Sequence, residues 1–435
     1  MLKTVLHPNT CKGNEMQPEI SILNNGLRIV SLKYPQFETV SLGIWVNTGS
    51  AYERENMNGI SHFLEHMVFK GTASRSAAAI SEDIENVGGQ TNAYTSREFT
   101  AFYAKMLKDD LELAVDVLCE LVTSPQFAED ELVKEREVVV QEIKQTYDDP
   151  GDIVFDYMQA EAFAGQAMGR PILGTADLVR SFGAGELRAY MKTNYAAENM
   201  VFCAVGNVDH GQLVKMVETR LSGLQAKTSF AADRQHYTGG YFAEKRDTEQ
   251  AQVILGFDGF SYADERYYAA MLMSTVLGGG MSSRLFQEVR EKRGLVYSIY
   301  SFPTFYTGAG FTGIAAATDN EQVNKMLPVM IDEIKKIAAA PVGEAELKRA
   351  KAQVKSAILM SLESSSAVSE KLARQLLLFN RSIPIEETIA KIEEVGVEDV
   401  RAAAETIFAS KPTYALVGNV DGHYGYDEIC RLLKA

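Results

Sequence analysis

The chain has 435 residues, of which 46% are hydrophobic and 23% charged. These proportions are typical of folded globular proteins, and the length exceeds what one hydrophobic core usually supports, so we expect at least two domains. The formal net charge of −15 argues against nucleic acid as a partner and is compatible with cationic partners.

The N-terminal twenty residues contain no apolar segment of signal-peptide length, and no run of about eighteen apolar residues occurs anywhere. We therefore expect a cytoplasmic protein without a membrane span. The four cysteines lie far apart and form no C-x-x-C pair, which favours buried thiols over disulfides or zinc ligands. They are Cys11, Cys119, Cys203 and Cys430.

Two segments of the first half, 39–53 and 100–107, are rich in β-branched and aromatic residues and are predicted to be strands. Between them, GISHFLEHMVFK (59–70) predicts a helix. Gly71 suits the residue after the helix end, and Lys70 complements the negative end of the helix dipole.

Three polar residues of this helix lie on one face. At 100° per residue, His62, Glu65 and His66 fall within an arc of about 100°, so both imidazoles can reach one ion beside the carboxylate. Histidines one turn apart are more often incidental than ligands. Together with the glutamate, however, they form H-x-x-E-H, the inverse of the H-E-x-x-H zinc motif. A third ligand is still needed to complete such a site.

The two halves of the chain repeat one plan. The sequence VGNVD occurs at 205–209 and again at 417–421, each time after an apolar strand and before a helix. ELVKEREVVVQEI (131–143) is helical and has a weaker counterpart in ELKRAKAQVKSAI (346–358). A repeat of this length indicates a duplicated domain.

We therefore predict an α+β fold of two homologous domains, each a mixed or antiparallel sheet with long helices against one face. In the second half, AQVILGFDG (251–259) and GFTGIAAAT (310–318) are the expected strands. The predicted domains are 16–223 and 241–435, joined by a polar linker at 224–240.

Three segments together carry a resemblance to a known family: GISHFLEHMVFKGT (59–72), GGQTNAYTSREFTAFYAKML (88–107) and EREVVVQEI (135–143). They resemble the pitrilysin-type zinc peptidases, or inverzincins. The likeness is greatest to the mitochondrial processing peptidase catalytic subunit and its bacterial relatives. It implies half of a clamshell chamber and a zinc-dependent endopeptidase that binds one Zn²⁺ per chain.

The resemblance also implies the roles of individual residues. His62, His66 and Glu142 would bind zinc, Glu65 would be the catalytic base, and Glu135 would take part in catalysis without binding the metal. The local pattern agrees, because positions 135 and 142 lie only about 20° apart on a helix. The alternative for both glutamates is a solvated acidic face.

Further residues are implied on the substrate side. The segment GGQTNAYTSRE (88–98) resembles an edge strand on which an extended peptide is added, centred on Asn92, Ala93 and Tyr94. In the second half, a helix ending near Arg293 and capped by Gly294 is expected to lead into a strand, LVYSIYS (295–301).

Within that second segment, Arg290 and Tyr297 match a substrate-holding pair of the family. The alternative is an exposed arginine on a helix and a tyrosine packed on a strand. The glycines at 278–280 lack the spacing of a phosphate-binding loop.

The second half offers an internal comparison. Its counterparts of Glu135 and Glu142 are Ala350 and Ala357, so the metal residues are confined to one repeat. The family encloses substrates with four such domains, which implies a homodimer or a heterodimer with an inactive sister chain. Short or unfolded peptides, and basic, presequence-like ones in particular, are the expected substrates. A non-catalytic scaffold of the same fold is the alternative, although such a scaffold is expected to have lost the metal residues.

Overall fold

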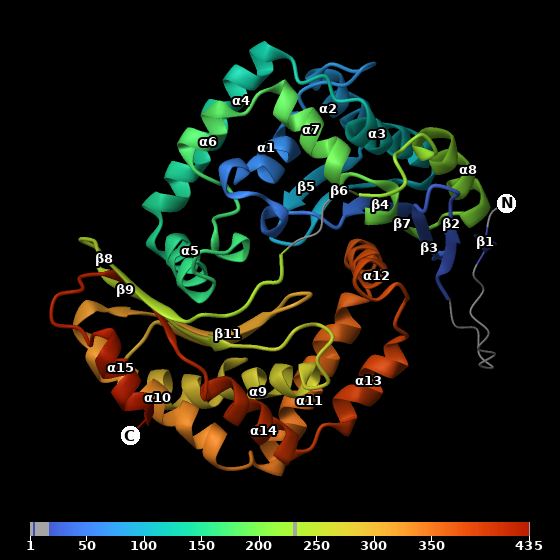
Figure 1. The fold of residues 1–435 in the computed structure, drawn as a ribbon. Helices are drawn as coiled ribbons and strands as arrows, with labels where there is room; N and C mark the ends of the chain where they lie inside the picture. Colours follow the sequence, from blue (N-terminus) through green and yellow to red (C-terminus); the bar gives the residue numbers. More distant parts are fainter. Residues whose placement is uncertain (1–2, 5–16, 229–232, 435) are drawn as a thin grey trace. The chain divides into compact units, whose positions relative to one another are not determined.

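The computed structural model describes residues 3–4, 17–228 and 233–434, which form two compact units (Figure 1). The first unit contains the described residues of 1–143, 171–233 and 359–383. The second contains those of 144–170, 234–358 and 384–435. Both units are a mixed sheet packed with helices, as the predicted α+β class requires.

The sheet of the first unit has the strand order β1-β2-β3-β7-β4-β6-β5. Neighbouring strands are antiparallel except β3 and β7, which are parallel. β5 is a terminal strand and pairs with β6 alone among the described strands. The strands are β1 (Lys3–Thr4), β2 (Glu19–Ile22), β3 (Arg28–Lys33), β4 (Thr39–Val46), β5 (Gln90–Thr95), β6 (Thr100–Leu107) and β7 (Met200–Gly206).

Most helices of the first unit cover one face of this sheet and enclose its main core. Phe63 of α1, Leu118 of α3 and Leu213 of α8 meet Phe102 and Phe202 of the sheet there. The helices are α1 (Ile60–Val68), α2 (Ala77–Glu85), α3 (Leu111–Thr123), α4 (Glu129–Asp148), α6 (Ala176–Ser181), α7 (Ala184–Asn194) and α8 (His210–Leu221).

The other face of this sheet is covered by α12 (Ser365–Phe379), a helix from the second half of the sequence (Figure 1). Leu372 and Leu376 pack there against Trp45 and Val201. The prediction of helices on one face only is therefore wrong for this sheet. All seven residues of β7 are buried, the pattern of a strand with apolar cover on both sides.

The sheet of the second unit has the order β10-β11-β9-β12-β8, with β12 and β8 parallel. Its main core lies against α9 (Tyr267–Gly278), α10 (Val323–Ala339) and α14 (Val397–Phe408). The strands are β8 (Gly240–Lys245), β9 (Gln250–Asp258), β10 (Ser298–Phe305), β11 (Gly310–Asp319) and β12 (Thr413–Gly418). The remaining helices are α11 (Glu344–Ser361), α13 (Ile385–Glu394) and α15 (Tyr426–Lys434).

A helix from the first half of the sequence, α5 (Pro150–Ala162), packs on this second sheet (Figure 1). The rings of Tyr157 and Phe242 are 4.2 Å apart, and the Tyr157 hydroxyl donates to Glu244 at 2.6 Å. The two repeats thus exchange one helix each, α5 for α12. The contiguous boundaries 16–223 and 241–435 differ from the compact units at these two helices.

Several local expectations can be compared directly. The segments 39–46, 100–107, 250–258 and 310–319 are strands, and 60–68 is a helix. The segment 295–301 differs, because β10 begins only at Ser298. A π-helical turn, η6 (Phe286–Glu291), comes first, and the amide of Leu295 still bonds back to the carbonyl of Val289.

The described cysteines are free thiols. Cys119 and Cys203 are buried free thiols and Cys430 is a half-buried one, whereas Cys11 lies outside the described residues. Among the described helices, none combines the length and the apolarity needed to cross a membrane.

Candidate metal centre

The helix α1 is held by its apolar face and by its N-terminus. Phe63, Leu64 and Met67 are completely buried, so the polar side chains must project from the opposite face. At the N-terminus, the buried carboxylate of Glu53 accepts the backbone N–H groups of Gly59 and Ser61, each at 2.8 Å. These bonds satisfy donors that a helix start leaves unpaired, and they fix where α1 begins.

The helix α4 supplies the acidic side of the centre. Leu132, Val139 and Val140 are buried and hold α4 in the core. Glu135 lies on this inner side and is only 4% exposed. Glu142, two turns further along, keeps 41% of its side chain exposed. Glu135 is therefore shielded from solvent, whereas Glu142 is accessible to solvent.

Three electron-pair donors converge between α1 and α4. The Nε2 atoms of His62 and His66 each lie 3.6 Å from Oε2 of Glu142, and the three ligand atoms are all within 4.8 Å of one another. A separation of 3.6 Å is too long for a hydrogen bond. Ligands of a tetrahedral zinc ion are about 3.4 Å apart, since zinc bonds to nitrogen and oxygen are near 2.1 Å. The donor set therefore fits a zinc ion.

His66 is oriented from behind by Glu135. Its Nδ1 lies 2.8 Å from Oε1 of Glu135, and Lys70 contacts the other oxygen, Oε2, also at 2.8 Å. Because a carboxylate only accepts, the imidazole proton lies on Nδ1 and the Nε2 lone pair faces the centre. Such carboxylate–histidine pairs are usual behind metal-binding imidazoles.

The charges of this group follow from its surroundings. Burial alone would lower the pKa of His66, but the hydrogen bond to Glu135 and the nearby carboxylates outweigh it and raise that pKa. Burial likewise opposes ionisation of Glu135, yet its bonds to His66 and Lys70 hold its pKa below the usual value. Burial, helped by the neighbouring His66, lowers the pKa of His62 to about 3, so this imidazole is neutral and able to bind a metal.

Glu65 lies on the same face of α1 and has a different partner. The hydroxyl of Thr95, the last residue of β5, donates to Oε2 of Glu65 at 2.5 Å. Burial raises the pKa of Glu65, partly offset by the Thr95 hydrogen bond and by His66. A half-buried carboxylate of raised pKa beside a metal site suits a group that must both take and release a proton.

The predicted substrate residues lie on two different elements. Asn92, Ala93 and Tyr94 are in β5, and the Tyr94 hydroxyl donates to Glu370 of α12 at 3.1 Å. Arg290 is half-buried on η6 with its guanidinium over the ring of Phe286, and Tyr297 precedes β10 and is 73% exposed. These last two belong to the second unit, and their role remains a prediction.

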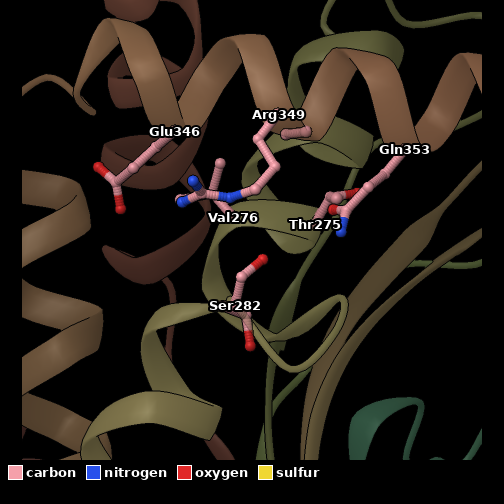
Figure 2. A pocket seen from close by; sticks show the side chains of 8 residues that line it. Thr275, Val276, Ser282, Glu346, Arg349 and Gln353 are labelled. Atoms are coloured by element: carbon pink, nitrogen blue, oxygen red, sulfur yellow. The ribbon is translucent and has the colours of Figure 1, made fainter.

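The corresponding place in the second unit is a small pocket between α9 and α11 (Figure 2). It is shallow and partly open to solvent. Ala350, the counterpart of Glu135, lines it together with Thr275 and Gln353. The described residues there include no group of metal ligands.

Sequence reasoning missed three residues around the centre. The sequence gives no role to Glu53 or Thr95, and it predicts for Lys70 only an interaction with the helix dipole. Thr95 is far from Glu65 in the sequence, and Glu53 is near the amides of Gly59 and Ser61, but neither contact belongs to a known sequence motif. Lys70 does have a signal, because it lies one turn after His66 on the same helix face.

Comparisons with known proteins bear on this arrangement. A family model described as Insulinase (Peptidase family M16) matches residues 28–176, and one described as Peptidase M16 inactive domain matches residues 181–354. An uncharacterized zinc protease of Streptomyces coelicolor is 38% identical over 411 residues, covering 91% of this chain and 88% of that protein. One of Bacillus subtilis is 36% identical over 394 residues, covering 90% and 96%.

Two solved structures share the fold. A protease from Helicobacter pylori has a TM-score of 0.85 at 22% identity, covering 93% of this chain and 99% of that one. A peptidase M16 inactive domain protein from Pseudomonas fluorescens has the same TM-score at 21% identity, covering 93% and 98%. With two family models in tandem, close relatives along most of its length and the converging donors of α1 and α4, the chain belongs to peptidase family M16.

Proposed function

We propose that the chain is a zinc-dependent endopeptidase. The observation that carries this proposal is the convergence of His62 and His66 of α1 with Glu142 of α4. Glu65 lies on the same face of α1 as the two histidines. The relatives from Streptomyces coelicolor and Bacillus subtilis, which are named zinc proteases, support the same activity.

His62, His66 and Glu142 would hold one zinc ion per chain. When bound, the ion would supply a water of lowered pKa and polarise the scissile carbonyl. Glu135 acts behind these ligands, since it keeps the His66 proton on Nδ1 and so directs Nε2 toward the metal.

Glu65 carries the proton transfers. As a carboxylate it takes a proton from the attacking water, and as the resulting acid it delivers that proton to the leaving amine nitrogen. Burial raises the pKa of Glu65, which makes its carboxylate a stronger base toward the attacking water.

The substrate would bind as an extended peptide along β5, whose second edge is unpaired among the described strands. Asn92, Ala93 and Tyr94 would provide its main-chain contacts. Arg290 and Tyr297 would hold the peptide or stabilise the developing oxyanion. The net charge of −15 favours basic, presequence-like peptides that are short or unfolded.

We further propose that two chains act together, as a homodimer or with an inactive sister chain, in a chamber of four homologous domains. The scaffold alternative is disfavoured because the complete donor set and Glu65 are retained. Gel filtration with activity measured across the peak separates a self-sufficient homodimer from a chain that needs a different partner.

The decisive experiment is hydrolysis of a quenched basic peptide by purified protein, before and after chelation, with zinc then restored. Loss of activity on chelation and recovery with zinc would support a metallopeptidase. Inactive protein that binds no zinc would contradict the proposal and favour the scaffold. A library digest tests the peptide preference, which would be refuted by faster cleavage of acidic peptides.

A further inference from the structure

The side chain of Glu65 has a single hydrogen-bond partner in the described part of the chain. That partner is the hydroxyl of Thr95, at 2.5 Å from Oε2. By contrast, the imidazole of His66 is held from behind by Glu135, which is itself held by Lys70. Glu135 of α4 thus holds the imidazole of His66, whereas the carboxylate of Glu65 is held only by Thr95 of β5.

The length of this hydrogen bond is informative. A hydroxyl that donates to a carboxylate at 2.5–2.7 Å makes a charge-assisted bond, which is stronger than a neutral one. A glutamate side chain has three rotatable bonds, so without a partner its carboxylate would sample several orientations. The hydrogen bond from Thr95 fixes the position of Oε2 and thereby limits the positions that Oε1 can take.

Thr95 occupies a particular place in the sheet. It is the last residue of β5 and pairs with Thr100 of β6. Side chains alternate along a strand, so Thr91, Ala93 and Thr95 share one face of β5 and Tyr94 lies on the other. Tyr94 contacts α12 on its face, and Thr95 contacts α1 on the opposite one. The strand that would carry the peptide is therefore joined directly to Glu65.

From these contacts we propose that Thr95 is a positioning residue for the reaction: its hydroxyl holds the Glu65 carboxylate in the orientation that proton transfer requires. This inference rests on the proposed peptidase function and extends it to the strand β5. A shift of β5 when a peptide pairs with its edge would be passed to Glu65 through this one bond. Thr95 itself need not touch the substrate.

Three variants test the proposal. Thr95→Val keeps the shape of the side chain and removes the donor, and Thr95→Ser keeps the donor. Thr91→Val is the matched control, because Thr91 is on the same strand and face but donates to the main-chain oxygen of Tyr103 at 3.1 Å. For the zinc-loaded protein we would measure kcat, KM, zinc content and zinc affinity by chelator competition.

We expect Thr95→Val to lower kcat about 10-fold to 100-fold, the range for loss of a hydrogen bond to a charged group, with KM nearly unchanged. Zinc content and affinity should match the wild type, since Thr95 contacts no metal ligand. Thr95→Ser should recover most of the lost kcat, and Thr91→Val, which removes a hydroxyl from the same strand without touching Glu65, should lower kcat much less than Thr95→Val.

Each contrary outcome has a distinct meaning. Unchanged or raised kcat in Thr95→Val would overturn the positioning role, and so would a loss that serine does not recover or that accompanies loss of zinc. A wild-type protein without metal-dependent hydrolysis would instead refute the proposed function, and this inference with it.

Discussion

Replacement of Glu135 by glutamine should weaken zinc binding about 10-fold while leaving all three proposed ligands in place. Glutamine can still accept the Nδ1–H of His66, but it lacks the negative charge that strengthens the imidazole as a ligand. A hydrogen bond to a charged group contributes about 1.5–3 kcal/mol and a neutral one about 0.5–1.5 kcal/mol. The midpoints of these ranges differ by about 1.3 kcal/mol, and about 1.4 kcal/mol corresponds to one decade in affinity.

The same substitution removes the ion pair between Lys70 and Glu135, whose side chain is 5% exposed. Some loss of stability is therefore expected, and zinc affinity should be compared at a temperature well below the unfolding transition of both proteins. The assay is competition with a chromophoric chelator of known affinity.

Glu137→Gln provides a matched control on the same helix. Glu137 is exposed and forms an ion pair with Arg180 at 3.0 Å, so its loss changes the charge of α4 without touching His66. Equal effects of the two substitutions would refute the reasoning, because they would reduce the role of Glu135 to general electrostatics. An unchanged zinc affinity in Glu135→Gln would refute it as well.

Three further predictions concern the base, the metal and the scaffold. Glu65→Gln should keep one zinc per chain, measured by atomic absorption, yet lose about 10³-fold in kcat, since glutamine cannot take the proton and the proposed metal ligands are unchanged; an active variant free of contaminating protease would contradict this. Zinc affinity should fall as the pH falls, because protons compete with zinc for the Nε2 lone pair of His66. The raised pKa of His66 extends this competition to higher pH. Titration with a competitor whose own affinity does not depend on pH checks the sign, and a zinc affinity independent of pH would contradict it. Arg75→Met should destabilise the first unit by about 1–3 kcal/mol in urea unfolding, because Arg75 joins Asp83 and Asp116, each at 2.8 Å, and also pairs with Glu120. A loss below about 0.5 kcal/mol would show that these are ordinary surface pairs.

The parts of the centre that were predictable from the sequence are the local ones. His62, Glu65 and His66 share a face because helical geometry places residues three and four apart together, whatever the rest of the fold. Glu142 could not be reached in this way, because its approach to α1 depends on how α4 packs, and only the family resemblance pointed to it. The pairing of Thr95 with Glu65 is non-local in the same sense and had no motif to reveal it.

In the fold, too, the local elements were predictable from the sequence and their packing partners were not. Amphipathic patterns identify α5 and α12 as helices with a buried face, but they do not say which sheet buries that face. The sequence repeat therefore suggested two contiguous domains, and the exchange of these helices was not foreseen. The β10 boundary differs for a local reason, since residues 292–297 form an irregular connection between the π-helical turn and Ser298, although residues 295–297 have the composition of a strand.

The exchange of α5 and α12 has a consequence for how the protein is made. When a ribosome has synthesised the first seven strands, the face of their sheet that carries Trp45 and Val201 still lacks its cover. That cover, α12, emerges only after most of the second half has been translated. The nascent first half must therefore expose an apolar surface for much of synthesis, which makes it a natural client for chaperones and a poor candidate for expression as an isolated fragment.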